Sequence, residues 1–338
     1  MDNLRGNHIL MNDLDSTTAG YTELASPTAN QGKGWQPIGT EDDLFTGTFD
    51  GQGYEIRDLF IYRPDESDVG LFGVVDEGGV IENVGVVNGN VTGYDDVGGL
   101  VGYNNKGTFT DSYSSGSVTG NGEVGSLVGY NDEGSVSNSY SSGSVIGNNS
   151  VGGLVGYNFF GTVTDSYSSG SVTGQNNVGG LVGWNEASTM SNSYSTGSVT
   201  GNYTVGGLAG KNSGTASTSY SSGSVTGDDN IGGMVGENTG TVSNSYSTGN
   251  VTGDSSVGGL VGDNPGTVSD SFWDTQTSGQ DTSDGGSGKT TEGMTDFDTF
   301  DGVGWDITTV DPGETNPNYT WNIVDTVTYP FQSWESVV

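Results

Sequence analysis

Residues 151–174 read VGGLVGYNFFGTVTDSYSSGSVTG, and variants of this stretch recur along most of the chain. The VGGL-like core returns at intervals of 26 to 28 residues. The cores begin at Val69, Val97, Val124, Val151, Val178, Val205, Ile231 and Val257. Near-constant spacing is typical of a solenoid, in which each unit buries its apolar face against neighbouring units. The repeat therefore predicts one stacked, elongated body.

The composition of the unit predicts strands and turns rather than helices. Val, Thr, Ser, Tyr and Gly dominate it, and no amphipathic run of helical length occurs. Turns that contain glycine and asparagine divide each unit into three strand-like pieces, for example 99–103, 108–114 and 117–119. We therefore expect an all-β fold, a right-handed parallel β-helix (β-solenoid) with 26–28 residues per coil and a cap at each end.

The period divides the chain into three parts. The expected parts are an N-terminal cap with the first coils, the repeat solenoid and an aromatic-rich C-terminal cap, at residues 1–68, 69–269 and 270–338. Trp35, Phe45 and Leu59 are expected to close the open N-terminal end, because an exposed β edge invites aggregation. The Ser-, Gly- and Asp-rich residues 275–291 predict a mobile surface loop.

One asparagine occupies the same step of seven successive units. These residues are Asn104, Asn131, Asn158, Asn185, Asn212, Asn238 and Asn264. Stacking places equivalent residues above one another, so each side-chain amide can hydrogen-bond to the next. The pattern predicts a structural amide ladder along the rod.

Two further columns concern the residues around Asp111. Tyr113 recurs as a column of aromatic residues beside small serines, and the sequence leaves open whether tyrosine or serine points inward. The column of Asp111 alternates acidic and amide residues, which keeps like charges two coils apart. This alternation favours a structural role over a catalytic pair of carboxylates.

The charge of the chain is strongly one-sided. Its 338 residues hold 42 Asp and Glu against seven Lys and Arg and one His, a formal net charge of −35. Such a field repels nucleic acids and anionic membranes, so neither is an expected partner. Self-repulsion is weakest in high salt, where the Debye length falls to about 3 Å at 1 M. The charge therefore favours a halophilic source, with calcium loading as the competing explanation.

The sequence lacks the residues and motifs that several functions require. The chain has no cysteine, no apolar run long enough for a bilayer and no signal-peptide pattern, so an export signal was removed or never used. The single histidine, His8, lies outside any HExxH motif or triad pattern, and no phosphate-binding loop or DxDxDG calcium loop occurs. We expect no membrane insertion, no cofactor and no metal site.

A carbohydrate-active enzyme stays open as an alternative, because two carboxylates are enough for glycoside hydrolysis. The candidate pairs are Asp95–Asp96, Asp132–Glu133 and Asp228–Asp229. In a chain this acidic, solvated turns are the simpler interpretation of these pairs. The expectation is that the protein is not an enzyme.

The repeat cores resemble a known family. VGGLVGYN at 97–104 and 151–158 and VGGLVGWN at 178–185 are similar to the GLUG motif. GWQPIG, FTGTFDGQG, SFWD and YPFQSW at the two ends of the chain extend the resemblance. It implies an extracellular β-helical module, as in streptococcal IgA-cleaving metallopeptidases outside their catalytic part and in acidic haloarchaeal surface proteins. No catalytic residue of the family exists to be carried over.

Aromatic residues provide the candidate ligand-binding surface. They are Tyr103, Tyr130, Tyr157, Phe159, Phe160 and Trp184. Four of them occupy one step of consecutive units, where they form a binding strip if they point outward and a stabilising ladder if they point inward. The ladder is the simpler interpretation, but Phe159 and Phe160 interrupt an otherwise polar turn.

These observations predict a non-enzymatic, structural or adhesive module outside the cell or on its surface. The expected partners are a glycan or a cell-surface protein. One alternative is a fibre or receptor-binding protein on the surface of a halophilic virion, for which a homo-oligomer such as a trimer is expected.

Overall fold

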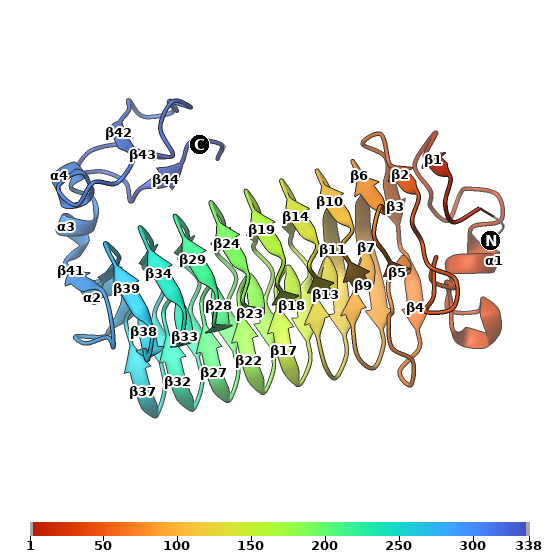
Figure 1. The fold of residues 1–338 in the computed structure, drawn as a ribbon, viewed down its shortest axis with the longest axis horizontal. Helices are drawn as coiled ribbons and strands as arrows, with labels where there is room; N and C mark the ends of the chain where they lie inside the picture. The colour runs from red at the N-terminus through yellow and green to blue at the C-terminus, as the bar shows by residue number, and fades with distance from the viewer. Residues whose placement is uncertain (1–2, 336–338) are drawn as a thin grey trace.

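The computed structural model describes residues 3–335 and has the predicted fold. The chain forms a right-handed parallel β-solenoid of about eight turns, with about 27 residues per turn and little helix. Successive coils lie side by side along a rod, with the N-terminal segment at one end and the C-terminal segment at the other (Figure 1).

A typical coil has five short strands rather than the expected three. The strands of one coil are β17 (Asn149–Gly152), β18 (Val155–Phe159), β19 (Thr162–Thr164), β20 (Tyr167–Ser168) and β21 (Val172–Thr173). The break between β19 and β20 falls at Asp165, which adopts a left-handed conformation with φ of 50°. Asn and Asp tolerate this conformation best among residues with a side chain. Equivalent residues of adjacent coils pair in parallel, for example Val155 with Val182.

Each step of the coil forms a sheet that runs along the rod. The first sheet contains β1 (Asn7–Ile9), β2 (Thr48–Asp50), β6 (Val80–Glu82), β10 (Thr108–Thr110), β14 (Ser135–Ser137), β19, β24 (Thr189–Ser191), β29 (Thr215–Ser217), β34 (Thr241–Ser243) and β39 (Thr267–Ser269). The second contains β8 (Val97–Gly98), β12 (Val124–Gly125), β17, β22 (Asn176–Gly179), β27 (Tyr203–Gly206), β32 (Asp229–Gly232) and β37 (Ser255–Gly258). The third contains β5 (Phe72–Val75), β9 (Val101–Asn105), β13 (Val128–Asp132), β18, β23 (Val182–Glu186), β28 (Ala209–Asn212), β33 (Val235–Asn238) and β38 (Val261–Asp263).

The fourth sheet has two rows that share the long strands β7 (Gly85–Thr92) and β11 (Tyr113–Thr119). One row contains β3 (Glu55–Arg57), β15 (Tyr140–Ser141), β20, β25 (Tyr194–Ser195), β30 (Tyr220–Ser221), β35 (Tyr246–Ser247), β40 (Phe272–Asp274) and β41 (Ser287–Lys289). The other contains β4 (Phe60–Tyr62), β16 (Ser144–Ile146), β21, β26 (Val199–Thr200), β31 (Val225–Thr226) and β36 (Val251–Thr252).

The remaining elements lie at the two ends. They are α1 (Thr22–Ala25), a 3₁₀ turn η1 (Asn30–Gly32), α2 (Thr275–Ser278), α3 (Thr291–Met294), α4 (Phe297–Asp301) and a small sheet of β42 (Ile307–Thr309), β43 (Trp321–Ile323) and β44 (Phe331–Gln332).

The core is a narrow column of apolar side chains. In the coil of β17 to β21, Val151, Leu154, Val155, Val163 and Val172 are all at most 1% exposed. Equivalent side chains of adjacent coils contact one another, so one cluster extends from the first coil to Trp273. Removing the methyl groups of one such leucine typically costs about 2–5 kcal/mol.

Serine, and not tyrosine, points inward after the left-handed residue. Ser139 and Ser141 are buried, whereas Tyr140 between them is half-exposed. The Ser139 hydroxyl donates to Ser137 O at 2.7 Å and accepts the Ser112 N–H of the previous coil at 3.2 Å. Small polar side chains therefore fill a part of the core that a tyrosine ring would overfill.

The Asp and Asn residues in the column of Asp111 are explained by the backbone turn at this position more than by the spacing of charges. Asp111, Asn138, Asp165 and Asn192 all have positive φ, between 48° and 51°. A hydrogen bond between amide and carboxylate occurs at Asn192 Nδ2 and Asp165 Oδ1, at 3.3 Å. Left-handed backbone, rather than alternation itself, explains the choice of Asp and Asn here.

The seven asparagines form a continuous row inside the rod. Six of them are completely buried, and each Nδ2 donates to Oδ1 of the asparagine in the next coil at 2.7–2.9 Å. Asn104 also closes its own turn, because its Oδ1 accepts the Gly107 N–H at 2.9 Å. The row thus satisfies polar groups that burial would otherwise leave unpaired.

The N-terminal segment stacks on the first full coil. The strands β2, β3 and β4 each pair in parallel with strands of the next coil. Phe45 and Leu59 are buried, whereas Trp35 is half-buried and donates from Nε1 to Leu71 O at 3.0 Å.

Residues 275–291 lie mostly at the surface, as expected, but they contain α2 and β41 instead of an unstructured loop. The buried Asp274 carboxylate caps α2 by accepting the N–H groups of Gln276 and Thr277. The Ser283 hydroxyl accepts two N–H groups of the last coil, and β41 pairs with β40. The segment therefore seals the end of the rod by polar contacts, which its low hydrophobicity does not reveal.

The C-terminal aromatic residues cover a side of the rod. Phe300, Trp305 and Trp321 form a second apolar cluster with Tyr220 and Tyr246 of β30 and β35. Trp273, by contrast, joins the main core at the end of the rod.

The asparagine row should be essential for stability. We expect Asn158→Ala to lower the free energy of unfolding by about 3 kcal/mol, because it leaves a buried donor on Asn131 and a buried acceptor on Asn185 unpaired. Asn148→Ala is the control, since this partly exposed amide also bonds to adjacent coils but water can replace it. Urea denaturation measures both changes, and equal losses would contradict the expectation.

Candidate functional site

The aromatic strip lies on the outer face of the third sheet. We use this name for Tyr103, Tyr130, Tyr157, Trp184, Phe159 and Phe160. Its first four rings come from β9, β13, β18 and β23 and are half-buried. The rings of Tyr130, Tyr157 and Trp184 stack at centroid distances of 4.8 and 4.9 Å, about 21–22° from parallel. The strip is therefore both outward-facing and stacked, two properties that the sequence analysis treated as alternatives.

Stacking determines what the strip can present to a ligand. Each ring in the middle of the stack covers a face of its neighbours, so mainly the ring edges are left for a ligand. Tyr103 differs, because it is tilted by 57° from Tyr130. At the other end, the Lys211 ammonium lies 5.6 Å from the ring centroid of Trp184 and pairs with Glu237 at 2.9 Å. A sugar ring that needs a free aromatic face finds few along this row.

Acidic side chains line the strip. The Tyr103 hydroxyl donates to Asp132 Oδ2 at 2.9 Å, and the Tyr157 hydroxyl donates to Glu186. Burial, followed by these carboxylate contacts, raises the pKa of both tyrosines well above the usual value, and burial raises the pKa of Tyr130 to about 12. The hydroxyls therefore remain neutral donors at physiological pH.

Phe159 and Phe160 project from the turn beside Tyr157. Their rings meet edge to face at 4.5 Å, and Phe160 is 58% exposed. Phe160 also has φ of 49°, a conformation that is costly for a bulky residue. The equivalent left-handed positions hold Lys106, Glu133 and Ala187. An exposed phenylalanine with left-handed backbone is expected to contribute little to stability.

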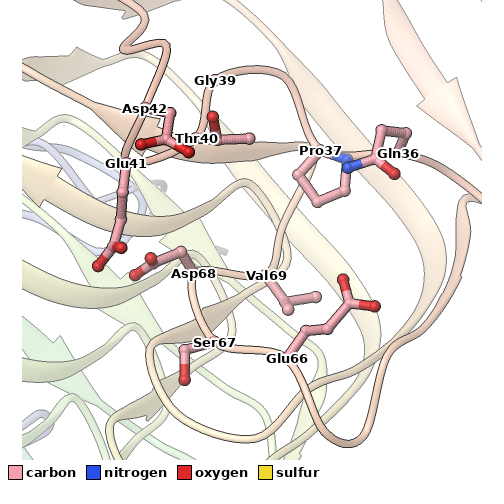
Figure 2. A pocket seen from close by; sticks show the side chains of 10 residues that line it. All are labelled: Gln36, Pro37, Gly39, Thr40, Glu41, Asp42, Glu66, Ser67, Asp68 and Val69. Carbon is pink, nitrogen blue, oxygen red and sulfur yellow. The ribbon is translucent and has the colours of Figure 1, made fainter.

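The structure reveals an acidic pocket that the sequence analysis missed. It lies between the N-terminal segment and the first full coil and has a volume of about 380 Å³. Glu41, Asp42, Glu66 and Asp68 are among its lining residues. The side chains of Glu41 and Asp68 point toward one another across it (Figure 2).

The pocket continues into a column of carboxylates on successive coils. Asp68, Asp96 and Glu123 each precede a VGGL-like core, with no amide between them. Burial, followed by the charge of Glu41, raises the pKa of Asp68 to about 6. Burial, followed by the charge of Glu123, raises the pKa of Asp96 to about 8, and the buried Asp96 Oδ1 has no hydrogen-bond partner. The position before the repeated core was the signal that could have revealed this column.

The acidic pairs singled out from the sequence are not brought together at one site. Asp96 belongs to the carboxylate column, whereas Asp132 accepts the Tyr103 hydroxyl and Asp228 accepts the Asn202 amide at 2.7 Å. Within residues 3–335, no group of three or more His, Cys, Asp or Glu side chains is placed to hold a metal ion.

A second aromatic row was noted in the sequence but not proposed as a site. The tyrosine column consists of Tyr113, Tyr140, Tyr167, Tyr194, Tyr220 and Tyr246. Its rings stack at 4.8–5.1 Å and within 11° of parallel on the outer face of the fourth sheet. The C-terminal segment covers one end of it and leaves the other end open.

The fold and the repeated columns define a parallel β-solenoid, and four of its coils match a known repeat. The family model of the GLUG motif matches four consecutive coils, at residues 93–119, 120–146, 147–173 and 174–200. The chain thus carries four tandem GLUG motifs, as the resemblance of its cores predicted.

Two relatives match shorter parts of the chain. Halomucin of Haloquadratum walsbyi is 46% identical over 79 residues, which are 22% of this chain and 1% of halomucin. A protein assigned as a Gly-rich membrane protein in Evansella cellulosilytica is 36% identical over 98 residues, which are 27% of this chain and 10% of that protein. The matched segment is therefore a small fraction of either relative.

Among solved structures, a protein assigned as an immunoglobulin A1 protease from Bacteroides ovatus aligns with 98% of this chain and 86% of its own chain. The TM-score is 0.42 and the sequence identity is 18%. Separately, none of the helices found between residues 3 and 335 has the length and hydrophobicity needed to cross a membrane.

The carboxylate column predicts a pH dependence of stability. The folded state holds protons on Asp68 and Asp96 that the unfolded chain releases near pH 4, so the free energy of unfolding should fall as pH rises from about 4 to 8. We expect Asp96→Asn to flatten this dependence, as measured by urea denaturation at fixed salt. Asp254→Asn, which removes an exposed charge elsewhere, should leave the slope unchanged. A slope insensitive to Asp96→Asn would refute this role.

The strain at Phe160 gives a second prediction. Phe160→Asn should raise the free energy of unfolding by about 1 kcal/mol, because asparagine adopts left-handed backbone at lower cost. Phe159→Asn, in the adjacent strand position, should give no gain. Thermal denaturation compares the two variants, and a loss of stability in Phe160→Asn would show that its ring supports the fold.

Proposed function

We propose that the chain is a non-enzymatic adhesive module of a larger protein outside the cell or on its surface. The observation that carries this proposal is Phe160, a strained and exposed aromatic residue beside a stacked row of rings. Exposed apolar patches of this kind mark interaction sites in soluble proteins.

The GLUG motifs and the match to halomucin support a surface setting. The net charge of −35 and the relative's name support a halophilic source, since high salt screens self-repulsion. Membranes and nucleic acids remain improbable partners for the same electrostatic reason.

The geometry of the strip favours a protein partner over a glycan. Most ring faces are covered by neighbouring rings and two tyrosine hydroxyls bond to carboxylates, whereas the ring edges and the exposed Phe160 are accessible. Phe160 supplies an apolar anchor, and Asp132 and Glu186 supply a polar rim. This combination resembles the centre and edge of a protein interface.

Glycan arrays and whole-cell binding in molar salt test the proposal. We expect the wild-type chain to bind cells and the variant Tyr157→Ala/Phe159→Ala/Phe160→Ala to lose binding. Tyr203→Ala is the control, because Tyr203 is 54% exposed on another sheet. Circular dichroism verifies that all three proteins are folded. If the wild type binds neither cells nor glycans, the strip is not adhesive and the rod is a spacer.

A second candidate function, from the enzyme class, is favoured by the acidic pocket. Glu41 and Asp68 face one another, and a carboxyl group with a pKa of about 6 suits a general acid in glycoside cleavage. Release of reducing sugar from acidic and neutral polysaccharides, compared between wild type and Asp68→Asn, decides this point.

The viral-fibre alternative is decided by the mass of the assembly. Light scattering that gives a trimer would favour a fibre, whereas a monomer would favour a module within a longer surface protein.

A further inference from the structure

The tyrosine column is covered over only part of its length. At its C-terminal end, Tyr220 and Tyr246 are buried beneath the C-terminal segment. At the other end, Tyr113, Tyr140 and Tyr167 remain half-exposed. Because the rings are nearly parallel throughout, the open and covered parts present the same ring edges at the same spacing.

The chain's own tail shows what chemistry this surface accepts. The Trp334 indole lies beside the edges of Tyr194 and Tyr167, with centroid distances of 5.5 and 6.3 Å and planes 22° and 29° from parallel. Gln332 Nε2 donates to Thr218 O at 2.8 Å, and the Tyr220 hydroxyl donates to Glu335 Oε2 at 2.8 Å. The tail therefore binds at a position, called a seat below, that combines the carbonyl acceptor of Thr218, the hydroxyl donor of Tyr220 and the ring edges of Tyr194 and Tyr167.

The solenoid repeats this seat along the rod. Two coils toward the N-terminus, Asp165 stands in the column position of Thr218, and Tyr167 stands in that of Tyr220. Tyr140 and Tyr113 then take the places of the two rings beneath the indole. A groove of about 160 Å³ opens here, lined by Tyr140, Asp165, Tyr167 and others and bounded by Trp334.

Two hydroxyl groups of the open seat lack an acceptor within the described residues. At the ends of the column, Tyr113 donates to Glu55 and Tyr246 donates to Pro330 O. For Tyr140 and Tyr167 the structure gives no acceptor within residues 3–335. Aromatic edges carry partial positive charge, so the ring edges and the free hydroxyls of Tyr140 and Tyr167 favour an electron-rich, acceptor-bearing ligand.

We infer that Tyr113, Tyr140 and Tyr167 form a docking surface for an extended peptide of a partner protein, one that carries an aromatic side chain followed by a carboxylate. The chain's own Gln332–Glu335 segment is the template for this peptide. The surface lies on the fourth sheet, away from the aromatic strip on the third. It is therefore independent of the proposed adhesive role.

The test uses the full chain in molar salt and a capped peptide with the sequence of residues 331–335, FQSWE. Isothermal titration should detect binding of this peptide, and replacing its tryptophan by alanine should weaken binding about tenfold. Tyr140→Ala/Tyr167→Ala should weaken binding by at least about the same factor. Tyr130→Ala, on the other aromatic row, is the matched control and should bind like wild type.

The variant Trp334→Ala adds a gain-of-binding arm. It frees the ring edges of Tyr167 and Tyr194, so the peptide should bind more tightly than to wild type. Absence of peptide binding, equal affinity for the tryptophan and alanine peptides, or binding unchanged in Tyr140→Ala/Tyr167→Ala would overturn the inference. Binding of a soluble hexasaccharide in place of the peptide would also overturn it. These peptide-binding results do not depend on the aromatic strip, so they would stand even if the chain failed to bind cells.

Discussion

Backbone hydrogen bonding between coils in strict register is the constraint on which the rest of the molecule depends. It places each residue directly above its counterpart one repeat earlier, as Val155 lies beside Val182. A sequence column thereby becomes a physical row, and its chemistry is multiplied along the rod. Valine and leucine give a continuous core, asparagine gives a row of amide bonds, and tyrosine gives two stacks of rings.

Columns that repeat without interruption were predictable for this reason. The period of 26 to 28 residues, together with Val, Thr and Gly, was sufficient for the β-solenoid, and the spacing of Asn104 and its equivalents led to the expectation of an amide row that the structure contains. The strip from Tyr103 to Trp184 was also found by its spacing. The ring faces that this strip leaves open to a ligand could not be predicted, because the tilt of a ring depends on its neighbours and not on its position in the sequence.

Features that depend on side-chain orientation or on polar contacts between distant segments could not be predicted from the sequence. Ser139 is buried beside the half-exposed Tyr140 because one left-handed residue, Asn138, rotates the chain. A single φ angle is not visible in a hydrophobicity pattern. Residues 275–291 contain few apolar side chains, yet Asp274 and Ser283 fix them through hydrogen bonds. Glu41 and Asp68 face one another although they belong to two separate turns, and only the fold brings these turns together.

The asparagine row also gives the rod a direction. All six bonds of the row donate toward the C-terminal coil, so the side-chain dipoles add instead of cancelling. Aligned amides polarise one another, which strengthens each successive bond. The direction of this row is thus fixed inside the core, where no surface substitution can reverse it.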